Sequence, residues 1–247
     1  MAFVNAQNCR ITVGDRQWAG DVSDVSSNST VSTYDVTCLS DSSRALLAGV
    51  GSGDMTLTGF VDSANAGTAN SQWQDIRLLR QTSAGVPAMI GFDGFTAADP
   101  LWVTNVWETN WTTTGSVAAA DTFTLTLTTT GALDYGKSLF DLAAAQTTTA
   151  NGTAVDNSAS SSSGATVVLS VVAASGTSPT LDVVVQHSAD NSTYTALTGG
   201  TFTQATGTTS ESLTIASGVT INRYTRVAVT IGGTGPSFTF AVGLARV

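Results

Sequence analysis

The sequence has little positive charge. Its 247 residues include nine Lys and Arg against 18 Asp and Glu, and Lys137 is the only lysine. Residues 1–150 hold 14 acidic and 6 basic residues, a net charge of −8, whereas residues 151–247 hold 4 and 3, a net charge of −1. Because binding to nucleic-acid phosphates requires clustered Lys and Arg, we expect no specific nucleic-acid binding through the phosphates.

Cysteine, histidine and long apolar runs are also scarce. Cys9 and Cys38 are far apart and define neither a disulfide framework nor a metal site, so we interpret them as small buried hydrophobes. His187, the only histidine, lies near the end of a predicted strand, where a structural role is favoured. No apolar run approaches the ~20 residues of a membrane span, and the first residues lack the features of a signal peptide. We therefore expect a chain that folds in a cytoplasm and has no contact with a membrane.

Motifs for catalysis and cofactor binding are missing as well. The sequence contains no Ser-His-Asp partnering, HExxH motif, P-loop, dinucleotide-binding fingerprint or DxDxDG calcium loop. The prediction is a protein that is not an enzyme and that binds no metal and no cofactor.

Thr, Ser, Ala, Gly and Val dominate the composition, which favours an all-β fold. In the clearest predicted strand, residues 121–130, Phe123, Leu125 and Leu127 alternate with threonines. One helix is expected near residues 71–80, where Trp73, Ile76 and Leu79 have helical spacing.

Two β units are predicted. Residues 1–146 form the first, residues 147–164 a flexible Ser/Thr-rich linker, and residues 165–247 the second. The second unit has short alternating strands separated by regular turn signals, which is typical of a small β-sandwich, either Ig-like or jelly-roll-like.

The most informative stretch runs from Asp35 to Asp62 and reads DVTCLSDSSRALLAGVGSGDMTLTGFVD. It resembles the signature of the tail tube (major tail) proteins of long-tailed bacteriophages, and the resemblance extends over roughly residues 1–140. The residues that carry it are Asp35, Val36, Thr37, Asp41, Ser43, Arg44, Leu46, Leu47, Gly49, Val50, Gly53, Met55, Leu57, Gly59, Phe60 and Asp62.

This resemblance implies a structural virion protein with a β-sandwich or barrel domain and one flanking helix. Hexameric rings, joined by β-pairing between subunits, would stack into a tail tube that is assembled in the host cytoplasm. The lumen would pass viral DNA without binding it specifically. The tape-measure protein and the tail terminator and tip proteins would be partners. The long polar stretch over residues 15–34 would be an extended hairpin arm that reaches the next ring, and stacking would use this arm and the polar turns near residues 40–43.

Candidate contact residues follow from this interpretation. Trp18 either anchors an interface or covers the core of its own subunit. Arg44 lies among acidic residues, which predicts an ion pair or a subunit contact. The candidates for contacts between rings or subunits are Trp18, Asp21, Asp24, Asp41 and Arg44.

A threonine-covered strand face is soluble and uncharged, and it could line the lumen or the outside of a tube. The candidates for the lumen are Asp54, Thr56, Thr58, Thr124, Thr126 and Thr128.

Two other functions stay open. A carbohydrate-binding adhesion module would be favoured if Trp102, Trp107 and Trp111 were exposed on one face, although core or interface packing is the favoured role for these side chains. Another virion component, such as a tail terminator or a capsid decoration protein, would stop at one ring or one lattice site. The second β unit would bind host-surface glycans or serve as decoration.

Overall fold

The computed structural model describes residues 8–62, 72, 76, 79–80, 85–131, 133–142 and 144–247. Nearly all the described elements are strands of one connected sheet, which confirms the all-β prediction. The strands are β1 (Arg10–Val13), β2 (Arg16–Gln17), β3 (Val22–Asp35), β4 (Leu46–Phe60), β5 (Val86–Gly91), β6 (Pro100–Ser116), β7 (Ala119–Thr129), β8 (Asp134–Phe140), β9 (Ala150–Asn151), β10 (Val155–Asp156), β11 (Ala165–Ser188), β12 (Thr195–Thr201), β13 (Thr209–Ile215) and β14 (Tyr224–Arg246).

The first core forms because β4 and β7 alternate apolar and polar side chains. The backbone register places Leu57 opposite Leu125 and Met55 opposite Leu127, and all four side chains are fully buried. Because side chains of paired residues lie on the same side of a sheet, the intervening threonines lie on the other side. The predicted alternation in both strands is confirmed.

A helix packs against this core, as predicted. Gln72, Ile76 and Leu79 are helical, and the last two are buried among the core residues. The Gln72 side chain anchors the helix to the end of β4, since its amide nitrogen donates to the Phe60 carbonyl at 3.0 Å and its amide oxygen accepts from the Asp62 N–H at 3.0 Å. Trp73, the other apolar position of the predicted helix, lies outside the described residues.

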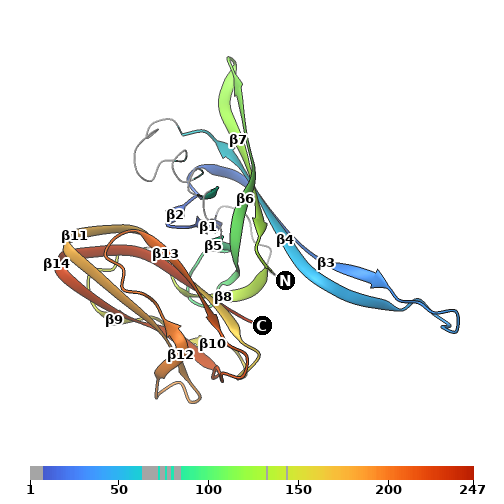
Figure 1. Cartoon of the computed structure of the whole chain (residues 1–247). Coiled ribbons are helices and arrows are strands. Elements are labelled where there is room, and N and C mark those ends of the chain that lie inside the picture. Colours follow the sequence, from blue (N-terminus) through green and yellow to red (C-terminus); the bar gives the residue numbers. More distant parts are fainter. Residues whose placement is uncertain are drawn as a thin grey trace.

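The second core belongs to a sandwich built mainly from two long strands. β11 and β14 are paired along almost their whole length, yet both ends of each strand bury apolar side chains in the same core. The two strands therefore bend together, and irregular register between residues 171 and 180 marks the bend. In this way one hairpin supplies both layers of the sandwich (Figure 1).

The sheet continues across the predicted domain boundary at residue 146. β8 pairs with β6 on one side and with β14 on the other. A third apolar cluster joins the halves, with Leu101 and Val103 packed among Val168 and Ala241. The Ser170 hydroxyl also donates to the Gly14 carbonyl at 2.6 Å.

The prediction of a flexible linker at residues 147–164 is wrong. β9 and β10 both lie within this stretch and pair with β14, and Val155 is fully buried in the sandwich core. The strands are two residues each, so their pairing is provided by the longer strand and leaves no pattern in the local sequence.

Candidate assembly surfaces

The hairpin of β3 and β4 extends beyond the rest of the sheet. The ladder between these strands continues from Val22 opposite Gly59 to Asp35 opposite Leu46, whereas β7 pairs with β4 only over Asp54–Phe60. Residues 29–53, called the arm below, therefore form a two-stranded ribbon that projects away from the body (Figure 1). The stretch 15–34, which the resemblance implies is an extended hairpin arm, contains β2 and most of β3, the first strand of this hairpin.

The arm exposes an unusual number of apolar side chains. The described residues include 13 exposed large hydrophobic side chains, and seven of them belong to the arm. An isolated two-stranded hairpin is marginally stable in water, and exposed apolar patches of this kind mark interaction sites. These seven residues are Val31, Tyr34, Val36, Leu39, Leu46, Leu47 and Val50.

Side-chain hydrogen bonds stabilise the turn at the tip of the arm. Asp35 accepts hydrogen bonds from the Thr37 N–H at 3.0 Å and from the Arg44 Nε at 3.0 Å. The hydrogen bonds from Thr37, and then the one from Arg44, hold the pKa of Asp35 below its usual value. Asp41 accepts from the Cys38 N–H at 2.7 Å. The predicted contact residues Asp41 and Arg44 thus lie together at the tip, where both are exposed and shape the turn.

The six residues predicted to face a lumen lie in register on one face of the sheet. Asp54 is opposite Thr128, Thr56 is opposite Thr126, and Thr58 is opposite Thr124. The Thr128 hydroxyl also donates to Asp54 at 2.7 Å. Residues far apart in the sequence are therefore brought together as the prediction required, although which way this face points in an assembly stays a prediction.

This face continues over four strands, in the order β3, β4, β7 and β6. Asp24 and Ser26 extend it on β3, opposite Thr58 and Thr56, and Asn110 and Thr112 extend it on β6, opposite Thr126 and Thr124. Asp24 is exposed there, so this predicted contact residue is accessible. The name polar face is used below for these polar members of the face, which include no Lys and no Arg: Asp24, Ser26, Asn28, Asp54, Thr56, Thr58, Asn110, Thr112, Thr124, Thr126 and Thr128. The exposed side chains of Phe60 and Trp107 lie on the same side of the sheet, opposite Thr122 and Thr128.

The same four strands have two free edges. Among the described residues β3 pairs with β4 alone, and the outer part of β6, residues 109–116, pairs with β7 alone. Each edge leaves a row of backbone N–H and C=O groups unpaired within the chain, and such edges can pair with another chain.

Two predicted contact residues are instead used inside the chain. Trp18 is fully buried and contacts the Phe123 ring edge-on, with 6.0 Å between the ring centroids. Asp21 forms a salt bridge of 2.5 Å with Arg16, and both side chains are largely covered. The prediction that Trp18 anchors an interface is therefore wrong, and the alternative that it covers its own core is confirmed.

The tryptophans of β6 do not form a common exposed platform. Trp111 stacks on Phe123 at 4.7 Å and Trp102 contacts the Tyr135 ring edge-on at 5.4 Å, so both are packed within the chain. Only Trp107 of the three is among the exposed large hydrophobic side chains, with 41% exposure. The condition that would have favoured a tryptophan platform for carbohydrate is not met.

The remaining candidates for chemistry have structural partners. The Nδ1 atom of His187 accepts from the Asn222 N–H at 3.1 Å, and burial lowers the pKa of this histidine. Cys9 is buried, as predicted, whereas Cys38 is exposed at the arm tip, so the prediction is wrong for Cys38. Within the described ranges no group of three or more His, Cys, Asp or Glu side chains is placed to hold a metal ion. The helical residues that the structure describes form no segment long and apolar enough to cross a membrane.

No protein-family model and no curated protein sequence matches the chain. Among solved structures, it is similar to a component of the virion of a native gene transfer agent particle, with 17% identity, a TM-score of 0.42, and 53% of this chain and 97% of that chain covered. A second similarity is to the tube-terminating cap of the anti-feeding prophage, with 15% identity, a TM-score of 0.41, and coverage of 52% and 88%.

A third similarity, to the Dit protein of phage SPP1, has 10% identity, a TM-score of 0.40, and coverage of 96% and 98%. These structural neighbours are related to phage tails, as the resemblance of the sequence predicted. Because all three TM-scores are below 0.5, none of these structural similarities carries an argument in the proposals below.

Sequence reasoning missed the apolar surface of the arm. The pattern of residues 44–50 predicts that they lead into a turn at residues 51–54, but β4 runs unbroken over Leu46–Phe60, so the turn prediction is wrong. Nothing in the pattern of Leu46, Leu47 and Val50 indicates that they lie on a ribbon that projects from the sheet. The available signal was the neighbouring stretch of residues 23–33, whose polar side chains offer nothing to cover an apolar partner.

Proposed function

We propose that this chain is a structural subunit of a phage tail tube, which assembles with copies of itself into rings that stack around a central channel. The observation that carries this proposal is the arm. Burial of one large apolar side chain contributes roughly 1.5–3 kcal/mol, so seven of them can outweigh the cost of ordering a ribbon against a neighbouring subunit. A scaffold role of this kind requires no catalytic group.

The two free edges provide the contact within a ring. The exposed edge of β3 in one subunit would pair with the outer part of β6 in the next, and repetition of this step closes a cyclic ring. The resemblance of the 35–62 stretch to tail tube proteins supports six subunits per ring.

Ring closure also favours one direction for the polar face. The apolar face of the four strands is covered by the chain's own core and helix, and this bulk fits the wider, outer side of a ring. The polar face is then left for the channel. Threonine hydroxyls and two carboxylates, without any cation, would let DNA pass because no counterion-releasing contact to phosphate is available.

The partners follow from this geometry. Viral DNA and, during assembly, the tape-measure protein would occupy the channel, and terminator and tip proteins would contact the ends of the tube. The C-terminal sandwich would decorate the outside. Assembly would take place in the host cytoplasm, and the protein would then belong to the virion tail.

Negative-stain electron microscopy of the untagged protein over a concentration series tests the proposal. We expect hollow tubes or stacked rings. The double variant Leu46→Ser, Leu47→Ser should abolish them while the protein remains folded, since both side chains are exposed in the single chain. Val247→Ser is the matched control, because it removes an exposed apolar side chain outside the arm.

The outcomes separate the candidate functions. Tubes from the arm variant that equal those of the wild type would contradict the role of the arm. Rings that never stack at any concentration would favour a terminator or another component that stops at one ring. Monomers at all concentrations would contradict self-assembly of the purified chain.

The direction of the polar face has its own test. Thr126→Lys places one cation in the middle of this face, and in a tube it should be repeated in every subunit. We expect assembled tubes of this variant to bind linear double-stranded DNA in a salt-dependent manner, as measured by co-sedimentation. Thr193→Lys, which adds one cation in the C-terminal sandwich and not on the polar face, is the control. Equal DNA retention by both variants would contradict a lumenal polar face.

A further inference from the structure

Two of the nine basic residues of this acidic chain lie at one cavity. Lys137 of β8 and Arg246 of β14 line a cavity of about 210 Å³ together with four other residues. In a chain with twice as many acidic as basic residues, the lining holds two cations and no carboxylate. The full lining is Tyr135, Gly136, Lys137, Asn157, Leu244 and Arg246.

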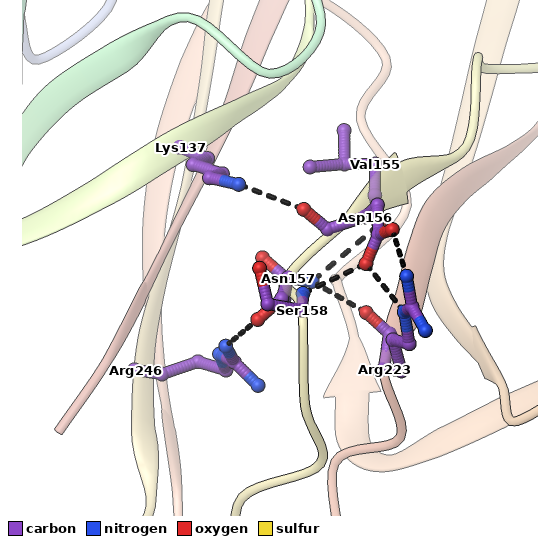
Figure 2. Close-up of polar contacts among 7 residues, drawn as sticks. All are labelled: Lys137, Val155, Asp156, Asn157, Ser158, Arg223 and Arg246. Atoms are coloured by element: carbon purple, nitrogen blue, oxygen red, sulfur yellow. Dashed lines mark hydrogen bonds and ion pairs between the residues drawn. The ribbon is translucent and has the colours of Figure 1, made fainter.

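Both cations are held by backbone carbonyls and not by acids. The Lys137 ammonium donates to the Asp156 carbonyl at 2.7 Å, and the Arg246 guanidinium donates to the Asn157 carbonyl at 2.8 Å (Figure 2). The same guanidinium also donates to the Ala159 carbonyl at 2.7 Å. Carbonyls fix the positions of the two side chains, and among the described residues neither cation forms a salt bridge with a carboxylate. Lys137 contributes, after Arg223 and Ser158, to the lowered pKa of Asp156. Asp156, the nearest carboxylate in this network, is engaged by Arg223 through two bonds of 2.7 and 2.6 Å.

Several donors and one acceptor that line the cavity have no hydrogen-bond partner among the described residues. An ammonium has three donors and a guanidinium five, so after these contacts Lys137 keeps two and Arg246 three. Asn157 uses its amide N–H groups, whereas no hydrogen bond to its amide oxygen occurs within the described part of the chain. Tyr135 is 62% exposed and offers an aromatic surface and a hydroxyl beside the cations.

This combination fits a particular ligand chemistry. Two fixed cations suit a carboxylate, a spare amide oxygen suits a sugar hydroxyl, and an exposed aromatic ring suits the apolar side of a sugar ring. The cavity has the size of one such ring and not of a chain segment. Simple inorganic anions would use the cations but neither the acceptor nor the aromatic surface.

We propose that the cavity between β8, β14 and residues 155–159 binds one carboxylated sugar residue, of the uronic-acid type, with Lys137 and Arg246 on the carboxylate, Asn157 on a hydroxyl and Tyr135 against the ring. This site differs from the tryptophans considered above and lies at the seam between the two halves of the chain. It adds recognition of an acidic glycan to a structural subunit, and it does not depend on tube formation.

Titration calorimetry and saturation-transfer NMR of the untagged chain with methyl β-D-glucuronide test the proposal, with methyl β-D-glucoside as the neutral comparison. We expect the glucuronide to bind at least about tenfold more tightly, since a charge-assisted hydrogen bond is stronger than a neutral one by about the 1.4 kcal/mol that a factor of ten requires. Lys137→Gln and Arg246→Gln should each weaken glucuronide binding about tenfold or more on the same grounds. Arg226→Gln, which removes a cation outside the cavity, should leave binding unchanged.

A second variant protects the test against misfolding. Arg246→Gln also removes contacts to two carbonyls, so its circular dichroism is compared with that of the wild type. Tyr135→Ala removes a largely exposed ring that has no hydrogen bond of its own but contacts the Trp102 ring edge-on, so its circular dichroism is compared with that of the wild type as well. It should weaken the binding of both glycosides while the chain stays folded.

Several results would overturn the proposal. These are equal binding of glucuronide and glucoside, inorganic phosphate competing as well as the glucuronide, and no glucuronide signal in the millimolar range. Loss of ring or tube assembly in Lys137→Gln, without any glucuronide binding by the wild type, would instead assign the cavity to a contact between copies of the chain.

Discussion

The arm and the β11–β14 hairpin are both long antiparallel ribbons, but the hairpin buries its apolar side chains and the arm exposes them. β11 and β14 bend together, so that the two halves of the ribbon cover each other and bury residues such as Val183 and Phe240. The arm has no such bend, and side chains such as Leu47 and Val50 remain exposed. A two-stranded β-ribbon can bury its apolar side chains within one chain when it folds back on itself. A ribbon that does not fold back needs another chain to cover them.

The bend itself has a recognisable physical basis. Gly176 has a φ of +117° and its α-carbon lies so close to the opposite strand that an added Cβ would be 2.7 Å from the Gly235 carbonyl oxygen. Gly233 also has positive φ and lies within one of the register shifts, between Gly232 and Thr234. The arm has no described residue with positive φ, so its ribbon continues without a fold.

The largest expected effect separates the two ribbons by their stability. Phe240→Ala in the sandwich core should lower the free energy of unfolding by about 3–5 kcal/mol, because it leaves a cavity in a fully buried site. Leu47→Ala in the arm should change the stability of the unassembled chain by less than about 0.5 kcal/mol, as expected for an exposed side chain. Urea denaturation of both variants measures the difference. Equal losses would show that the arm is part of the folded core and would remove the contrast.

A smaller effect is expected at the bend. Gly176→Val should destabilise the chain by about 1–3 kcal/mol, because valine is strained at this φ and its Cβ meets backbone atoms. Gly207→Ala is the control, since nothing lies within 4 Å of the added Cβ. Thermal unfolding of the two variants decides the point, and an unperturbed Gly176→Val would mean that the bend does not need the glycine.

The smallest effect concerns two exposed aspartates, Asp35 in the arm and Asp156 in β10, which pairs with β14. Hydrogen bonds from Arg223 are the largest cause that lowers the pKa of Asp156 to about 2, whereas Thr37 and not Arg44 is the largest cause for Asp35. Arg223→Gln should therefore raise the pKa of Asp156 clearly toward its ordinary value. Arg44→Gln should change the pKa of Asp35 less.

The sign of the linked pH effect follows from the lowered pKa values. Each aspartate contributes stability that is present above its unfolded pKa of about 3.9 and is lost as the pH falls toward the folded value. Carboxyl-carbon NMR titration of both variants measures the shifts. A larger change at Asp35 than at Asp156 would contradict this assignment of causes.

Alternation was a sufficient signal wherever a strand has one buried face. Met55 to Phe60 and Phe123 to Thr128 have such a face, and the face assignment of both strands from the sequence is correct. Helical spacing likewise located the helical residues Ile76 and Leu79. In each case one face of the element is exposed to water and the other is buried. Apolar residues therefore recur along the sequence with the repeat of the strand or the helix.

Alternation of apolar and polar residues gave no signal for strands that are stabilised by pairing with another strand and not by burial of one face. β3 is polar at most positions and most of its side chains are exposed, although Val22 and Val25 pack against the first core, so no period of burial marks it as a strand in the sequence. β9 and β10 are too short to show any period, and β14 provides their pairing. Trp18 could not be assigned because a large aromatic side chain suits a core and an interface equally well.

By itself, the sequence determined that this protein is a β protein with one helix, which strand faces are apolar, and that its surface is acidic and threonine-rich. These properties follow from local patterns, since each depends only on neighbours along the chain. Only the tertiary structure decided that the arm leaves the sheet, that Trp18 is internal, that the two halves share a sheet, and that Lys137 and Arg246 meet at one cavity. Each of those depends on which distant strand lies alongside, and contacts between remote residues are set by the packing of the whole chain.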